Sequence, residues 1–237
     1  MNTKMADYNN RFFKEIYAKS DKLIDIFLIC YFLFGLILAT WYGTWLVALV
    51  VGGINTIAYF SAKKLFPATR VNQYVASAVV GIYTAQFIYQ MHGLFEMHFF
   101  AFIGATLMIT YQNWKALLPV SLVVAVHHGL FAYLEYAGNK EVYFTTEAYD
   151  MDLLAFSFHI FLAVVIFVIC SLWSYELEKR TKLNTQNLIA VEELNNKMMM
   201  NIEFASALAL GTIPQKMEVV NDDILGEMLL KIQGRLK

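Results

Sequence analysis

Six long apolar stretches constrain this chain more than any other feature of its sequence. They cover residues 23–42, 44–62, 71–91, 95–112, 115–136 and 152–174. An α-helix needs about 20 mostly apolar residues to cross the hydrocarbon core of a bilayer. Within that core each backbone N–H and C=O must be paired inside the protein, which favours helices. The sequence therefore predicts an all-α, polytopic membrane protein with six transmembrane helices bundled over residues 23–174.

Composition excludes several other classes of protein. Hydrophobic residues make up 59% of the chain, too many for a soluble domain of 237 residues. The net charge of -1 argues neither for nor against a nucleic-acid partner, but the chain has no basic stripe or motif for one, so we expect none. Cys30 and Cys170 lie in two of the apolar stretches, so a disulfide framework is not expected either.

The distribution of Lys and Arg predicts how the bundle is oriented. Five of these residues precede the first stretch, three separate the second from the third, one begins the fifth, and three follow within ten residues of the sixth. The opposite loops hold only Lys140. Cytoplasmic loops carry the excess of positive charge, so both termini are expected in the cytoplasm. Residues 1–22 mix basic and apolar side chains, which predicts an amphipathic segment lying on membrane lipids.

All five histidines fall in the second half of the predicted bundle. His92 precedes the fourth stretch, His98 lies in it, His127 and His128 lie in the fifth, and His159 lies in the sixth. In the predicted orientation they share the outer side, within about one and a half helical turns of depth. Ionisable side chains in a bilayer usually face the bundle interior, a cavity or each other. We therefore expect a single buried site on the outer side.

The chemistry of these side chains indicates a transition-metal centre, because imidazole and carboxylate groups bind Cu, Fe and Zn. The candidate ligands are His92, Glu96, His98, His127, His128 and His159. Neighbouring His127 and His128 point about 100° apart on a helix, so either the site is broad or only one of them is a ligand. Glu96 and His98 point about 200° apart, so both face inward only if their helix begins irregularly near Gly93.

Two other occupants fit the same residues. Haem b needs two axial ligands from different helices, which it would take from His98, His127 and His159. The room for its macrocycle would come from Gly81, Gly104 and Gly129. A small organic ligand would instead use the histidines as hydrogen-bond partners. Histidines can also simply join helices by hydrogen bonds, which is the purely structural alternative.

The sixth stretch continues into a polar helix. Neither Gly nor Pro interrupts residues 152–210, so residues 175–193 are expected to link the bundle to the C-terminal part of the chain as one continuous helix. Leu188, Leu194 and Met198 form a loose apolar seam along it. Such a seam predicts a parallel coiled coil and hence a homodimer.

Residues 194–237 resemble a HAMP signal-relay module. The matching features are a first helix ending at Leu210-Gly211, a connector through Pro214, and Asp223-Ile-Leu-Gly-Glu-Met228 at the start of a second helix. Asp222 or Asp223 is expected to cap this second helix. Ile224 stands where the family usually has an acidic residue. The resemblance implies a relay within a homodimer and a cytoplasmic output domain beyond residue 237.

The membrane part is similar to a bacterial sensor module of six helices. The resemblance rests on Glu96-Met-His98-Phe99, Tyr111-Gln-Asn-Trp114, His127-His-Gly129 and the lone His159, and it covers roughly residues 20–175. Such modules precede histidine kinases, diguanylate and adenylate cyclases and chemotaxis-type domains. The resemblance implies signal reception at the bacterial inner membrane, and it does not fix the ligand.

An enzymatic role is the main alternative to a receptor. No nucleophile triad, P-loop or Rossmann fingerprint occurs, and no catalytic residue is assigned. A histidine-rich membrane oxidoreductase usually has H-x-x-x-H or H-x-x-H-H clusters near the cytoplasmic face, and both spacings are missing here. The continuous exit helix favours a receptor that binds a Cu, Fe or Zn ion, haem b or an organic ligand.

Overall fold

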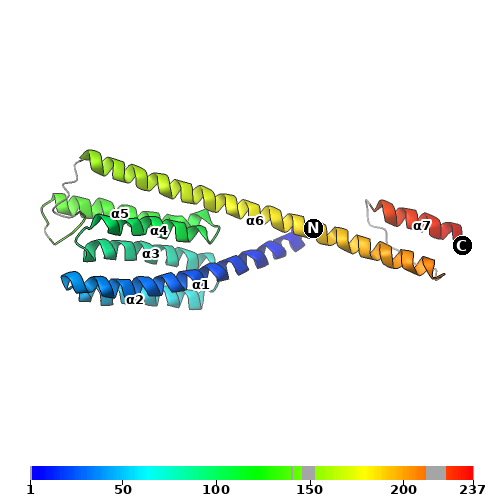
Figure 1. The fold of residues 1–237 in the computed structure, drawn as a ribbon, viewed down its shortest axis with the longest axis horizontal. Helices are drawn as coiled ribbons and strands as arrows, with labels where there is room; N and C mark the ends of the chain where they lie inside the picture. Colours follow the sequence, from blue (N-terminus) through cyan, green and yellow to red (C-terminus); the bar gives the residue numbers. More distant parts are fainter. Residues whose placement is uncertain (1, 140, 146–152, 212–222, 237) are drawn as a thin grey trace. The chain divides into compact units, whose positions relative to one another are not determined.

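The computed structural model describes residues 2–139, 141–145, 153–211 and 223–236, and all regular structure in these ranges is helical. The prediction of an all-α protein is thus confirmed. The α-helices are α1 (Asn2–Tyr42), α2 (Trp45–Leu65), α3 (Arg70–Gln90), α4 (Phe99–Ile109), α5 (Leu117–Tyr136), α6 (Leu153–Ala209) and α7 (Ile224–Leu236) (Figure 1). Two short 3-10 helices, η1 (Phe95–His98) and η2 (Trp114–Ala116), lead into α4 and α5.

The chain divides into two compact units. One is Asn9–Thr181, and the other combines Met1–Tyr8 with Lys182–Lys237. The predicted amphipathic segment, residues 1–22, is not a separate helix but the first part of α1. Likewise, residues 175–209 are the continuation of α6 and contain no break. The predicted divisions after residues 22, 174 and 193 therefore fall inside helices.

Helix α3 lies at the centre of the first unit, between α2 on one side and α4 and α5 on the other (Figure 1). Thirteen of its 21 residues are buried. Two glycines allow this close packing: a Cβ at Gly81 would lie 2.9 Å from Val123 Cβ, and one at Gly104 would lie 2.6 Å from Val80 Cγ1. Aromatic rings from α1, α3 and α4 pack together beside it.

Four helices are long and apolar enough to cross a membrane: Met5–Tyr42, Trp45–Leu65, Trp114–Tyr136 and Leu154–Ala209. The six-span prediction is therefore met only in part. Helix α3 is long enough but not apolar enough, because it carries buried Asn, Gln, Ser and Thr side chains. Neighbouring helices shield these side chains. The apolar helix Phe95–Ile109 falls short because of its length.

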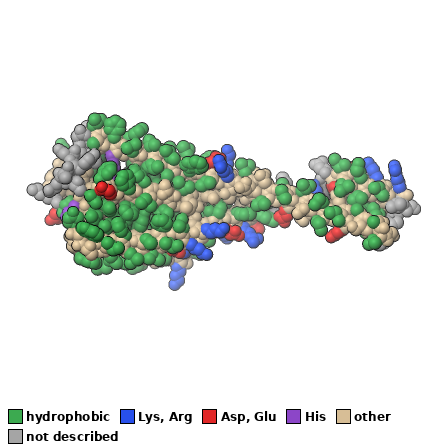
Figure 2. Space-filling view, in the orientation of Figure 1, with side chains coloured by type: hydrophobic (Ala, Val, Ile, Leu, Met, Phe, Trp, Pro, Cys, Tyr) green, Lys and Arg blue, Asp and Glu red, His purple; other side chains and the backbone are tan. Residues whose placement is uncertain are grey.

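The outward faces of the apolar helices carry large hydrophobic side chains. On α1 the exposed residues Ile26, Ile29, Leu33 and Ile37 recur at helical spacing. Helix α5 has a similar exposed series, formed by Leu118, Leu122, Val126, Leu130 and Tyr133. Figure 2 shows hydrophobic side chains over the visible face of this unit, with Lys and Arg gathered at one of its ends. Exposed apolar surface of this extent is typical of a protein embedded in lipid.

In the second unit Asp223 organises the start of α7. Its carboxylate accepts a hydrogen bond from Gly226 N at 3.1 Å, which is the geometry of an N-cap. Asn201 on α6 donates to the same carboxylate at 2.9 Å, and this bond holds the pKa of Asp223 below its ordinary value. One of the two predicted caps is therefore confirmed. The predicted connector through Pro214 lies outside the described residues.

Candidate metal centre

Three histidines from three helical segments converge in the first unit. His98 ends η1, His128 lies on α5 and His159 lies on α6, and one ring nitrogen of each lies within 4.8 Å of the others. The ring centroids are 5.2 Å apart for His98 and His128, and 5.4 Å apart for each of the other two pairs. His98 and His128 are buried and His159 is half-buried. This group can hold a metal ion.

Backbone carbonyls orient two of the three rings. His98 Nδ1 lies 3.2 Å from the carbonyl oxygen of Phe95, and His128 Nδ1 lies 2.9 Å from that of Val124. With the proton on Nδ1, each ring donates to its carbonyl and keeps a lone pair on Nε2. His98 Nε2 is buried and has no hydrogen-bond partner among the described residues. Metal-binding histidines commonly show this arrangement, one nitrogen fixed by a carbonyl and the other free to coordinate.

An unusual turn places His98 at the site. His92 and Gly93 have φ values of +50° and +75°, so the chain leaves α3 through the left-handed region before entering η1. At Gly93 a side chain would also be blocked, because a Cβ would lie 2.5–2.7 Å from backbone atoms of Thr145. The helix containing His98 therefore does begin irregularly near Gly93. His98 turns inward as a result, whereas Glu96 is exposed.

Aromatic rings and apolar grooves surround the three histidines. Phe144 lies over His98 and His128 at centroid distances of 5.6 and 5.2 Å, and Phe95 lies about 6 Å from His98 and His159. A groove of about 810 Å³ between α5 and α6 reaches His128 and His159. A smaller one of about 330 Å³ reaches His98 and His159. Both are lined mainly by apolar side chains, so the centre is screened from water.

The other predicted ligands lie outside this group. His92 stacks between Tyr42 and Tyr143, at centroid distances of 3.8 and 3.9 Å, and burial lowers its pKa. The His127 ring is buried 4.2 Å from the Phe131 ring, and neither ring nitrogen has a partner among the described residues. The structure thus brings together three of the six candidates. Roles for His92, Glu96 and His127 stay predictions.

Two of the three glycines expected to make room for haem are packed against other side chains. Val123 and Val80 fill the space beside Gly81 and Gly104. Of the three, only Gly129, which lines the larger groove, has nothing within 4 Å of an added Cβ. We therefore find no slot for a macrocycle formed by the three glycines together.

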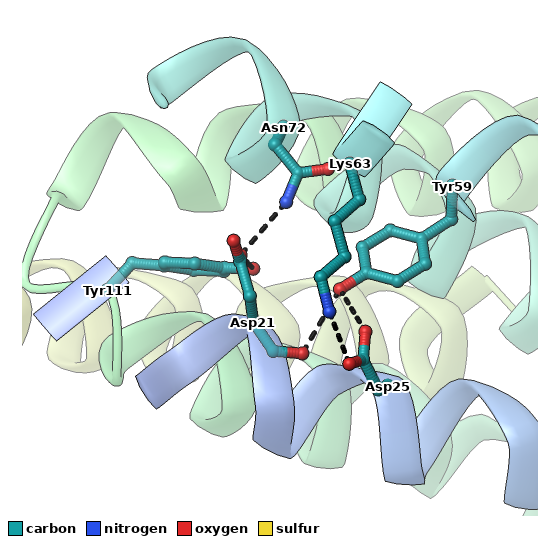
Figure 3. A network of polar contacts seen from close by, with 6 residues as sticks. All are labelled: Asp21, Asp25, Tyr59, Lys63, Asn72 and Tyr111. Carbon is teal, nitrogen blue, oxygen red and sulfur yellow. Dashed lines mark hydrogen bonds and ion pairs between the residues drawn. The ribbon is translucent and has the colours of Figure 1, made fainter. Parts of the chain in front are cut away.

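A second polar cluster, near the ends of α2 and α3, was not anticipated from the sequence (Figure 3). Asp21 of α1 accepts hydrogen bonds from Asn72 Nδ2 at 2.9 Å and from the Tyr111 hydroxyl at 2.8 Å. One turn further along α1, Asp25 accepts from the Tyr59 hydroxyl at 2.9 Å and pairs with Lys63. These contacts fasten α1 to α2, α3 and the turn between α4 and α5.

A pattern in the sequence could have revealed this polar cluster. Asp21 and Asp25 are four residues apart, as are Tyr59 and Lys63, so each pair shares one face of its helix. Polar pairs at this spacing in otherwise apolar helices indicate mutual partners inside a bundle.

None of the protein-family models, curated proteins or solved structures compared with the chain matches it. The assignment of a function therefore depends on the geometry of the site.

Proposed function

We propose that this protein is a six-span membrane receptor whose His98, His128 and His159 side chains bind a transition-metal ion. The observation that carries the proposal is the convergence of one ring nitrogen from each residue within 4.8 Å. Leaving the buried Nε2 of His98 without a partner is costly, and a metal ion would satisfy it.

The donor set favours an ion over haem. Three imidazole nitrogens on one side of an ion suit Cu, Fe or Zn, and three protein ligands leave a further coordination position open. Haem would need a slot between two axial rings, but each of these three rings lies next to the other two. An organic ligand held by the same histidines is the second candidate, because the larger groove opens directly beside His128 and His159.

The relay part of the proposal rests on α6. This helix carries His159 and continues to Ala209. Thr181 Oγ1 donates to Gln112 Oε1 at 2.6 Å, so α6 also contacts the turn between α4 and α5. A ligand shifts a conformational equilibrium only by its differential affinity for the two states. Metal bound between η1, α5 and α6 would hold α6 in one position, and a HAMP-like relay would carry that state to an output domain.

Metal analysis of the purified protein tests the proposal. We expect about one Cu, Fe or Zn ion per chain, matching a single three-histidine site, and no strong absorption band at about 400 nm. Such a band would instead identify haem. Absence of any metal after reconstitution with each of the three ions would contradict the proposal and favour the organic ligand.

We also propose that the receptor is a homodimer paired along α6. Beyond Lys182 one face of this helix buries Thr185 and Ile189, whereas Leu188 and Leu194 are 52% and 67% exposed. Together with the exposed Val191 and Met198 they recur every three or four residues, a spacing typical of a coiled-coil seam.

Cysteine crosslinking tests this pairing. With Cys30 and Cys170 replaced by Ser, we expect Leu188→Cys and Leu194→Cys to form disulfide-linked dimers in membranes. Ile189→Cys, on the buried face, serves as the control and should not crosslink. Failure of both seam variants to crosslink would contradict a parallel dimer.

A further inference from the structure

We infer that Phe144 and Glu135 form the outer entrance of the metal centre: Phe144 covers the centre, and Glu135 holds Phe144 in place. The ion would enter and leave through this cover and not through the grooves that face the bilayer. The inference rests on the proposed metal site and adds how the ion reaches that site.

Phe144 is buried against two of the candidate ligands, as a residue that covers the centre must be. It is 3% exposed, although it belongs to the loop that comes after α5. Its ring contacts those of His98 and His128, and also that of Phe156 on α6 at 5.8 Å. A loop phenylalanine packed on two candidate ligands closes that side of the centre to water.

Glu135 fixes the backbone that carries Phe144. One carboxylate oxygen accepts from Phe144 N at 2.7 Å and Thr145 N at 3.1 Å, and the other accepts from Thr145 Oγ1 at 2.8 Å. Glu135 lies in the last turn of α5, where the helix dipole disfavours a negative charge. Three hydrogen bonds to one short segment offset that disadvantage and explain a carboxylate at this position.

The turn before η1 supports the same segment from the other side. The missing side chain of Gly93 leaves room for the backbone of Thr145, and Tyr143 stacks on His92 at 3.9 Å. Residues 143–145 are thus anchored to α5 by Glu135 and to the turn after α3 by His92. These attachments would have to loosen for Phe144 to move aside.

The two grooves that reach the histidines among the described residues are unsuited to a hydrated ion. The two grooves at the histidines are lined mainly by apolar residues of α4, α5 and α6. Moving a divalent cation through such surroundings carries a large desolvation cost. The Phe144 side instead adjoins the polar backbone of residues 143–145 and the Glu135 carboxylate at the end of α5, so the ion has a less costly route there.

Metal-exchange kinetics of the full chain in lipid nanodiscs test the inference. The protein is loaded with Zn²⁺, and the release of Zn²⁺ to a water-soluble chelator is measured over time. The uptake of Zn²⁺ by the metal-free protein is measured in the same way. For Glu135→Gln we expect both rates to rise about tenfold or more, because a weakened hydrogen bond to a charged group changes the open population by that order. Phe144→Ala removes the ring that covers the centre and should raise both rates at least as much. The dissociation constant should change much less, since neither side chain is a ligand. Glu141→Gln, an exposed acid in the same loop, is the matched control and should leave both rates unchanged.

A second variant separates the two routes. Ala163→Leu narrows the groove between α5 and α6 and should not slow exchange. Slower exchange in this variant, or unchanged rates in both Glu135→Gln and Phe144→Ala, would overturn the inference while leaving the metal site intact. Glu135→Gln could also weaken Zn²⁺ binding and lower the thermal stability of the metal-free protein without raising either exchange rate. That result would show that Glu135 has only a structural role, and it too would overturn the inference. A wild-type protein that binds no Zn²⁺, Cu or Fe would instead refute the proposed function, and this inference with it.

Discussion

Replacing His98 with Ala will abolish high-affinity metal binding, weakening it by about a hundredfold or more. Loss of a residue that merely supports a ligand typically costs 10–100-fold in affinity, so loss of a ligand should cost at least as much. His98 has the geometry of a ligand, because its Nδ1 faces the Phe95 carbonyl and its buried Nε2 has no other partner among the described residues. We expect His128→Ala and His159→Ala to act in the same direction.

Competition with a chelator of known affinity measures this effect, and His92→Ala is the matched control. His92 lies close to His98 in the sequence, but it stacks between two tyrosines and is not part of the three-histidine group. Its replacement should change affinity by no more than about threefold, a small effect beside that of a lost ligand. A larger loss in His92→Ala than in His98→Ala would contradict the assignment of the centre. Thermal unfolding of the metal-free variants checks that each one folds.

The positions of α2 and α3 could be predicted closely from the sequence. The stretches expected at 44–62 and 71–91 correspond to Trp45–Leu65 and Arg70–Gln90. Physical chemistry explains this success, because a long apolar segment has few ways to pair its backbone other than as a helix. The same reasoning could not reveal that α3 lies at the centre of the bundle, since hydropathy describes a segment and not its neighbours.

The identity of the ligands could be predicted only in part. Helical spacing gives the angle between His127 and His128, but which of them faces His98 and His159 depends on how α5 is rotated in the bundle. An irregular helix start was a necessary condition for Glu96 and His98 both to face inward, and it is met, yet Glu96 does not face inward. It is exposed because η1 is a 3-10 helix, in which residues two apart still point about 120° from each other. The contact of Glu135 with residues 144 and 145 joins a helix to a loop without any local motif, so the sequence did not suggest it.

Inserting two glycines after Lys182 will leave metal affinity unchanged but disconnect metal binding from the relay. The insertion lies in the second unit, far along α6 from His159, so the ligands keep their positions. Two glycines weaken a helix by about 1 kcal/mol each relative to Ala. This is similar to the coupling of about 1–3 kcal/mol that typical allosteric proteins transmit. A helix weakened by this amount at Lys182 would bend there, and a movement of α6 near His159 would not reach Leu194.

The measurement is the effect of metal on the rate of crosslinking at Leu194→Cys, together with output in a receptor that carries a signalling domain. With the original helix we expect metal to change the crosslinking rate about fivefold or more, which is the lower end of typical allosteric coupling. With the two glycines the metal-dependent change should disappear. Inserting two alanines at the same place is the control, because it shifts the register equally but keeps the helix continuous. If the glycine insertion preserves the response to metal, α6 cannot be the route of the relay, and the turn that contacts α6 through Gln112 and Thr181 becomes the next candidate.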